Sequence, residues 1–222
     1  MLLLAFDTAT PAVTVALHDG VRPLASQTTV SSRRHGELLA AMIEQVLADG
    51  GATRAGLEAV AVGTGPGPYT GLRAGLVTAR VLASALGIPA IGVCTLDVMA
   101  RAAVPAAAGR EFTVAADARR KEVYWARYTP AGERIGDPEV SVPAELASAG
   151  ITQAGPVAGE GPVLYPDLGG DPIPPRYPDA AQLAAIAAQR LAERVPYGPP
   201  EPLYLRRPDA RVPGRPKRVT PV

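Results

Sequence analysis

The sequence predicts an α/β protein built from two copies of a βββαβα unit. Apolar runs of strand length alternate with apolar stripes of helical period, in the same order in each half. Asp7 precedes the segment VTVAL by six residues, and Asp117 precedes VYWAR by the same spacing, an offset of 110. The glycine loops VGTGP (62–66) and AGEGP (158–162) also correspond. Self-similarity of this kind indicates a duplicated unit.

The first half begins with three strands, of which the second and third are joined by a tight turn at Asp19-Gly20. The segment 33–51 carries a wide apolar stripe at helical spacing and ends at a glycine pair. The predicted βββαβα unit has strands at 2–7, 13–20 and 22–30, a helix within 33–51, a strand at 59–63 and a helix at 71–87. An extra strand at 88–93 and an extra helix at 95–103 follow it.

The second half repeats the order βββαβα. Its first strand ends at Asp117, and a Pro-Ala-Gly turn separates the second and third strands. The predicted elements are strands at 111–117, 123–128 and 133–142, a helix at 143–150, a strand at 156–162 and a long helix at 179–194.

Two βββαβα units placed face to face form the actin-like architecture (ASKHA, ribonuclease H-like), in which the cleft between the lobes is the default ligand site. We expect the first lobe at 1–103, with candidate interface helices, the second lobe at 104–200, and a Pro/Arg-rich tail at 201–222. The tail holds six basic and two acidic residues. We expect most of it to be loosely ordered, with contact to nucleic acid as the alternative.

Composition limits the partners. The 222 residues carry a net charge of +1, so whole-molecule charge predicts neither a nucleic-acid nor a membrane partner. No apolar run reaches membrane-spanning length, and the N-terminus lacks a basic signal region. The single cysteine, Cys94, fits a buried hydrophobe in a reducing compartment. We therefore expect a cytoplasmic protein.

The segment GTGPGPYTGLRAG (63–75) has the shape of a phosphate-binding loop without its working residues. No lysine follows the last glycine, the glycine spacing does not fit a dinucleotide site, and Pro66 and Pro68 lack N–H groups. A tight turn into a helix capped by Thr70 is one interpretation, with Arg73 seeking an acidic or anionic partner. Direct phosphate contact is the other. The candidate cofactor-binding residues are Asp7, Thr8, Gly65, Gly67 and Thr70.

Asp7 closes the first strand, where actin-like kinases place an Mg²⁺-linked aspartate. Ala9 occupies the position of their glycine, and the matching turn AADARRKE contains no glycine. A local cap or pair is the other role open to Asp7. His35 is followed at i+4 by Leu39, so the helical histidine pair of a metal site is missing. We predict no catalytic residue, no metal site and no cofactor bound by this chain alone.

Six segments resemble the TsaB (YeaZ) family in family order. They are LLLAFDTAT, RRHGELLAAMI, GTGPGPYTGLRAGL, GVCTLDVMA, DARRKEVYWARY and EPLYLR, spread over nearly the whole chain. One departure is Pro68, where the family usually has serine, which places any hydrogen bond from that position in doubt.

The resemblance implies a non-catalytic scaffold of the bacterial machinery that makes N6-threonylcarbamoyladenosine at position 37 of tRNAs reading codons that begin with A. In that machinery the catalytic paralogue TsaD transfers the threonylcarbamoyl group and TsaE is an ATPase. The implied partners are TsaD, TsaE, tRNA through the complex, and a second copy of the chain. Binding of ATP and Mg²⁺ within the complex is compatible with this resemblance.

The resemblance also implies an interface on the two helices of the first lobe. The candidate interface residues are His35, Leu38, Leu39, Met42, Val46, Gly71, Arg73, Ala74, Gly75 and Thr78. The alternative is that these stripes face the protein's own sheet, as amphipathic helices commonly do. Two further hypotheses are a stand-alone ATP-binding enzyme or M22-type peptidase-like protein, and a tRNA-binding module that uses the basic tail.

Overall fold

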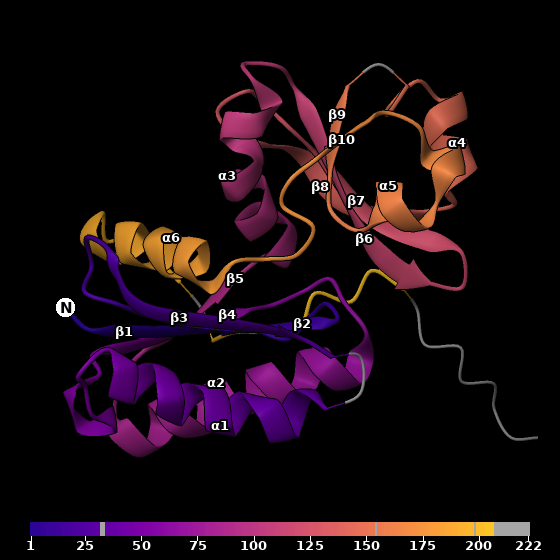
Figure 1. Cartoon of the computed structure of the whole chain (residues 1–222). Coiled ribbons are helices and arrows are strands. Elements are labelled where there is room, and N and C mark those ends of the chain that lie inside the picture. Colours follow the sequence, from indigo (N-terminus) through magenta and orange to yellow (C-terminus); the bar gives the residue numbers. More distant parts are fainter. Residues whose placement is uncertain (32–33, 154, 198, 207–222) are drawn as a thin grey trace, which may run out of the picture.

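The computed structural model describes residues 1–31, 34–153, 155–197 and 199–206, and it contains two five-stranded sheets (Figure 1). The first half contains β1 (Leu3–Asp7), β2 (Ala12–His18), β3 (Pro23–Val30), α1 (His35–Asp49), η1 (Arg54–Gly56), β4 (Ala59–Gly63), α2 (Tyr69–Leu86), β5 (Ala90–Val93) and α3 (Thr95–Ala107). The second contains β6 (Phe112–Arg119), β7 (Glu122–Tyr128), β8 (Arg134–Ser141), α4 (Pro143–Ser148), β9 (Pro156–Ala158), α5 (Gly161–Leu164), η2 (Pro166–Leu168), β10 (Asp171–Ile173) and α6 (Ala180–Ala192). No helix in these described ranges is long and apolar enough to cross a membrane.

The two sheets share one topology. The first has the strand order β3-β2-β1-β4-β5, and the second, read from its β8 edge, has the order β8-β7-β6-β9-β10. In the first sheet β1 pairs antiparallel with β2 and parallel with β4. In the second, β6 pairs antiparallel with β7 and parallel with β9. The predicted actin-like α/β fold with duplicated lobes is therefore confirmed.

The second half contains one strand and one short helix more than the sequence analysis predicted: β10 and α5. β10 follows α5 and η2, so that each half reads βββαβαβα when the short 3₁₀ helices are left aside. Asp171–Ile173 is only three residues long and has a central proline. A segment of this length has no readable alternation of apolar and polar residues, and its proline argues against a strand.

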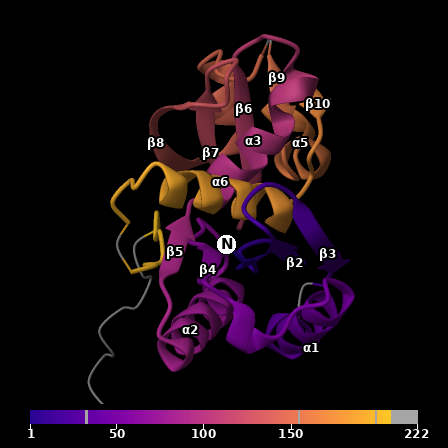
Figure 2. The ribbon, with the colours of Figure 1, turned by 90° about the vertical axis from the view of Figure 1, so that its left-hand side faces the viewer.

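Alternate residues of β1 contribute to two separate cores. Leu4 and Phe6 pack with the side chains of α1 and α2. Leu3 and Ala5 face the opposite way and pack with α6. The first sheet is thus the middle of three layers, with α1 and α2 on one face and α6 on the other (Figures 1 and 2). Burial on both faces explains why residues 2–7 form a nearly continuous apolar run.

The last helix of each half packs on the sheet of the other half. α6 contacts β1, β2 and β4 of the first sheet, whereas α3 contacts β6 and β9 of the second. Alanines at 180, 184, 187 and 188 are buried on α6 and let it approach the sheet closely. The lobes are therefore not the continuous segments 1–103 and 104–200 that we expected, because residue 103 lies within α3 and α6 covers the first sheet.

Residues 199–206, named here the C-terminal strap, are docked on both lobes. Leu203 N donates to Thr64 O at 2.8 Å in the first lobe. Arg206 forms an ion pair with Glu122 of β7 in the second. Residues 201–206 are therefore an ordered part of the predicted tail. The rest of the predicted tail, 207–222, lies outside the described residues.

Two glycines let α2 approach the turn after β1. The Thr8 hydroxyl donates to Gly71 O at 2.7 Å and accepts from Gly75 N at 3.1 Å. A Cβ atom at Gly71 would lie 2.6 Å from Thr8 O, and one at Gly75 would lie 2.5 Å from Thr8 Oγ1. Both distances are shorter than real Cβ contacts, so the packing of α2 on this turn requires glycine at these positions.

Gly71→Ala should lower the free energy of unfolding by about 2 kcal/mol, because the methyl group meets backbone rather than a movable side chain. Urea denaturation followed by circular dichroism measures the change. Gly36→Ala is the matched control, since Gly36 is also helical but a Cβ there has nothing within 4 Å. We expect the control to be neutral or stabilising by up to about 1 kcal/mol. Equal effects of the two substitutions would contradict the close-packing account.

Candidate functional site

The strand ends of the two lobes meet around one pair of cavities. A cavity of about 470 Å³ is lined by Thr8, Thr10 and His35 of the first lobe and by Arg119 of the second. A neighbouring cavity of about 540 Å³ is bounded by the glycine loop, the β6–β7 turn and the C-terminal strap. Pro68 and Arg119 line both cavities. This region is the cleft that the sequence analysis expected between the lobes.

Asp7 is fully buried at the end of β1, and both of its carboxylate oxygens are engaged. Oδ1 accepts from Ala9 N at 2.7 Å, and Oδ2 accepts from Thr95 Oγ1 at 2.7 Å. The Thr95 hydroxyl also accepts from Gly65 N at 3.1 Å. Burial raises the pKa of Asp7, and the hydrogen bonds from Ala9 and Thr95 oppose that rise. Asp7 therefore joins β1, the glycine loop and the start of α3.

The glycine loop packs directly on the turn that follows Asp7. A Cβ atom at Gly63 would lie 1.9 Å from Asp7 Oδ2, and one at Gly67 would lie 2.1 Å from Ala9 O. The structure thus brings Asp7, Thr8, Gly65 and Gly67 together as predicted, but in a close-packed turn. Thr70 is exposed near the start of α2 and lines the 470 Å³ cavity together with Thr8. The loop glycines allow close approach of one backbone to another.

Thr70 is not the helix cap that we predicted. α2 begins at Tyr69 with Pro68 as the N-cap, and no side chain caps its first N–H groups. Pro68 holds φ at −59°, and its carbonyl accepts the first helical hydrogen bond from Leu72 N at 3.1 Å. Proline fixes the chain direction here without a hydroxyl, which is why the helix begins ahead of Thr70.

Arg73 has aromatic partners where an acidic or anionic partner was expected. Its Nε donates to the Tyr204 hydroxyl at 3.1 Å. Its guanidinium carbon lies 3.6 Å from the centre of the Tyr69 ring, a cation–π contact. The Tyr69 and Tyr204 rings stack with their centres 5.4 Å apart. Arg73 therefore helps to hold the C-terminal strap against α2.

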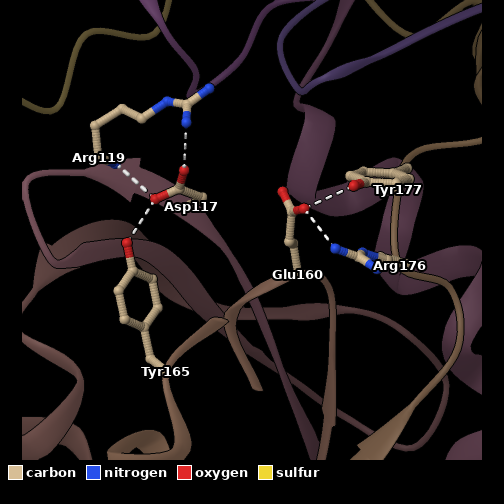
Figure 3. Close-up of polar contacts among 6 residues, drawn as sticks. All are labelled: Asp117, Arg119, Glu160, Tyr165, Arg176 and Tyr177. Carbon is tan, nitrogen blue, oxygen red and sulfur yellow. Dashed lines mark hydrogen bonds and ion pairs between the residues drawn. The ribbon is translucent and has the colours of Figure 1, made fainter. Parts of the chain in front are cut away.

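The second lobe has a matching aspartate turn. Asp117 Oδ1 accepts from Arg119 N at 2.8 Å, as Asp7 Oδ1 accepts from Ala9 N. Asp117 also accepts from the Tyr165 hydroxyl at 2.8 Å and pairs with the Arg119 guanidinium at 3.2 Å (Figure 3). Burial, together with the bond to Asp117, raises the pKa of Tyr165 to about 12. The tyrosine therefore stays protonated and keeps donating to the carboxylate.

Glu160 is a further carboxylate at the strand ends, and the sequence analysis did not single it out. Its Oε1 accepts from Arg176 Nη2 at 2.9 Å and from the Tyr177 hydroxyl at 2.6 Å (Figure 3). Burial, with the bond to Glu160, raises the pKa of Tyr177 to about 12. The signal was available in the repeat, because AGEGP places Glu160 at the position of Thr64 in VGTGP. The arginine and tyrosine partners come from a segment without a counterpart motif.

The described residues contain no group of three or more His, Cys, Asp or Glu side chains that could hold a metal ion. His35 lies near this region, but its Nε2 is 2.9 Å from Thr10 O. Leu39, one turn further along α1, is buried in the core. Asp7 accepts hydrogen bonds from an amide and a hydroxyl group, whereas Asp117 and Glu160 each also pair with an arginine.

Five predicted interface residues face the protein's own core. Leu39, Met42 and Val46 belong to the core between α1, α2 and the first sheet, and Gly71 and Gly75 contact Thr8. These residues cannot contact a partner, because they are buried within the chain. The other five retain some exposure: His35, Leu38, Ala74 and Thr78 are half-buried, and Arg73 is exposed.

The outer faces of α1 and α2 form an apolar groove of about 590 Å³, named here the α1–α2 groove. Its lining includes Ala40 and Ala41 of α1 and Val77, Val81 and Ala85 of α2. Val77 and Val81 are 58% and 63% exposed. The two helices that form it lie on the side of the first sheet opposite α6 (Figure 1). The edge of the stripe, rather than its centre, is therefore the part that these helices expose.

Fold and site together define a class of protein: a duplicated actin-like α/β chain whose strand-end carboxylates are engaged within the described part of the chain. The family model described as "TsaD: tRNA N6-adenosine threonylcarbamoyltransferase" matches residues 9–161. A protein of Mycobacterium tuberculosis, Rv3421c, is 42% identical over 213 residues, covering 94% of this chain and 93% of that protein.

Two further similarities are more specific. The tRNA threonylcarbamoyladenosine biosynthesis protein TsaB of Escherichia coli is 33% identical over 224 residues, covering 93% of this chain and 95% of that protein. The solved structure of YeaZ from Pseudomonas aeruginosa superimposes with a TM-score of 0.77 at 30% identity, covering 92% of this chain and 99% of that one. The chain belongs to the TsaB (YeaZ) family, as the sequence resemblance predicted.

The raised pKa of Asp7 predicts a pH dependence with a definite sign. The folded state binds this proton more tightly than the unfolded state, so the contribution of Asp7 to stability declines as pH rises from about 4 towards the folded pKa. Relative to Asp7→Asn, the wild-type protein should lose up to about 1.4 kcal/mol per pH unit in this window. Urea denaturation of both proteins between about pH 4 and pH 8 measures the difference.

Asp167→Asn is the control, because Asp167 is exposed in η2 and removal of its charge leaves the buried network intact. We expect its stability relative to the wild type to vary little with pH. The account of Asp7 is wrong if the difference between wild type and Asp7→Asn stays constant or grows in favour of the wild type as pH rises.

Proposed function

We propose that this chain is a non-catalytic scaffold subunit in tRNA threonylcarbamoyladenosine biosynthesis. In this proposal it binds the catalytic relative TsaD, which transfers the threonylcarbamoyl group to adenosine 37 of tRNAs that read codons beginning with A. It also helps to recruit the ATPase TsaE. The observation that carries the proposal is the engagement of Asp7, Asp117 and Glu160 within the protein, in a chain of the TsaB family.

Family membership supports the pathway. The E. coli relative is named for threonylcarbamoyladenosine biosynthesis and matches nearly the whole of both chains. The matching family model is that of the threonylcarbamoyltransferase itself, over residues 9–161. A non-catalytic chain that shares the fold of its catalytic partner is suited to pair with it through equivalent surfaces.

The strand-end geometry supports a non-catalytic role over a stand-alone enzyme. Metal-assisted phosphoryl transfer needs carboxylates free to hold Mg²⁺ and backbone N–H groups free to hold phosphate. Both carboxylate oxygens of Asp7 accept hydrogen bonds from within the protein, and Gly65 N donates to the Thr95 hydroxyl. Pro66 and Pro68 supply no N–H. The peptidase-like alternative lacks its histidine pair, because Leu39 stands one turn after His35.

The α1–α2 groove is the surface that we assign to TsaD. It is apolar, and its exposed Val77 and Val81 occupy one face of α2. Glu44 and Arg54 also line it and pair with each other at 2.8 Å, so the groove has a polar side as well. An apolar centre with polar groups beside it is typical of an interface. A second copy of the chain is the alternative occupant of the same groove.

The remaining partners follow from the complex. TsaE is proposed to bind the assembled pair, and tRNA to bind through the complex. ATP and Mg²⁺ are proposed to act on TsaD within the complex, because the described part of this chain offers no metal group. A direct tRNA contact through the basic tail concerns residues 207–222, which lie outside the described part.

Val81→Glu should weaken association with the TsaD relative from the same organism by roughly tenfold or more, because it places an unpaired charge in an apolar interface. Analytical gel filtration and surface plasmon resonance of the purified pair, with and without ATP, measure the effect. Val163→Glu is the matched control, since Val163 is 55% exposed on α5, away from the groove. Thermal unfolding should show that both variants fold.

The scaffold proposal is wrong if the wild-type pair does not associate either with or without ATP. If Val81→Glu leaves the association unchanged, the interface lies on a surface other than the α1–α2 groove. If Val81→Glu abolishes only a homodimer of this chain, the groove belongs to the second copy.

A further inference from the structure

The cavity beneath the C-terminal strap has a lining that the proposed scaffold role does not use. It measures about 540 Å³ and lies between the first-lobe glycine loop, the β6–β7 turn of the second lobe and the strap. This volume falls in the range of small-ligand sites. We propose that this cavity binds a nucleoside phosphate, with tyrosine rings against the base and arginines against the phosphate.

Three tyrosines line the cavity, one from each of its walls. Tyr69 begins α2, Tyr124 lies on β7, and Tyr204 belongs to the strap. Tyr69 and Tyr204 are 54% and 46% exposed although their rings stack on each other. Aromatic faces beside a cavity are the usual platform for nucleobases, because every base has a π-face. The described lining is otherwise mostly small or aliphatic.

Two arginines that line the same cavity are held by ion pairs: Arg119 by Asp117 and Arg206 by Glu122. The Arg119 side chain is 54% exposed despite its pair. Guanidinium groups carry five N–H donors, so an arginine oriented by one carboxylate still has donors for a phosphate.

The backbone of the β6–β7 turn is strained in a way that presents these side chains. Arg119, Arg120 and Lys121 have φ values of 62°, 55° and 63°, in the left-handed region that favours glycine. Three consecutive non-glycine residues in this region cost conformational energy. The turn keeps basic side chains where glycine would be easier, which indicates that the side chains are used.

This binding mode differs from that of an actin-like ATPase. The phosphate is held by guanidinium groups from one lobe and the strap, without the first-lobe loop and without a metal. A single phosphate on a stacked base fits, and either a free mononucleotide or an unstacked residue of an RNA strand presents that chemistry. The proposal revises our expectation that no cofactor binds to the chain alone, and it goes beyond the scaffold role.

Isothermal titration of the full chain at low salt, without Mg²⁺, tests the site with four probes: AMP, adenosine, inorganic phosphate and the hexanucleotide r(A)₆. AMP should bind saturably and more tightly than adenosine or phosphate. Tyr204→Ala and Arg119→Ala should each weaken AMP roughly fivefold or more. Tyr204→Phe should retain most of the affinity, because it keeps the ring.

Two matched controls should leave binding unchanged: Tyr197→Ala, since Tyr197 is 42% exposed outside the cavity lining, and Arg22→Ala in the β2–β3 turn. Tighter binding of r(A)₆ than of AMP identifies RNA as the source, and the reverse identifies a free nucleotide. The proposal is overturned if neither probe saturates in the millimolar range, if binding requires Mg²⁺, or if neither cavity variant weakens it. The experiment uses the isolated chain, so its failure leaves the scaffold role untouched.

Discussion

The first lobe depends on the hydrogen bonds made by the buried carboxylate of Asp7. It ends β1, accepts one hydrogen bond from the following turn and one from Thr95 at the start of α3. The glycine loop can pack on it only because Gly63 has no side chain, since a Cβ atom would lie 1.9 Å from the carboxylate. A buried charge is costly unless it is hydrogen-bonded in this way. Strand, loop and helix are therefore fixed by one group.

The same arrangement recurs in the second lobe, and it bears on function. Asp117 holds its own turn and is covered by Arg119 and Tyr165, while Glu160 is held by Arg176 and Tyr177. A carboxylate that neutralises a neighbouring arginine or serves a buried turn is not free to hold Mg²⁺ without breaking those bonds. The strand-end carboxylates of this protein thus maintain its shape.

The sequence predicted the parts of the fold that depend on local pattern. The offset between Asp7 and Asp117 correctly predicted two lobes with equivalent aspartate turns, since both accept from the backbone N–H two residues later. It did not predict that α6 packs on the first sheet, because an apolar stripe does not say which sheet it covers. β10 was not predicted, because three residues are too few to show an alternation of apolar and polar side chains.

The site was predictable to a smaller extent. The glycines were correctly placed beside Asp7, but their role as close-packing residues depends on distances that no motif records. Leu39, Met42 and Val46 were listed as candidate interface residues, because a helical stripe does not reveal which of its edges stays exposed. In the structure these three are buried, and the exposed residues beside them are Val77 and Val81. Glu160 was visible in the repeat, whereas Tyr165 and Tyr177 reach their carboxylates only through tertiary contacts.

We propose that these carboxylates support the fold and do not hold a metal. Titration of the isolated protein with Mn²⁺, a paramagnetic substitute for Mg²⁺ observed by electron paramagnetic resonance, tests it directly. The account predicts no saturable site in the micromolar range, and identical traces for the wild type and Asp117→Asn. A stoichiometric micromolar site that is lost in Asp117→Asn or Asp7→Asn would contradict it.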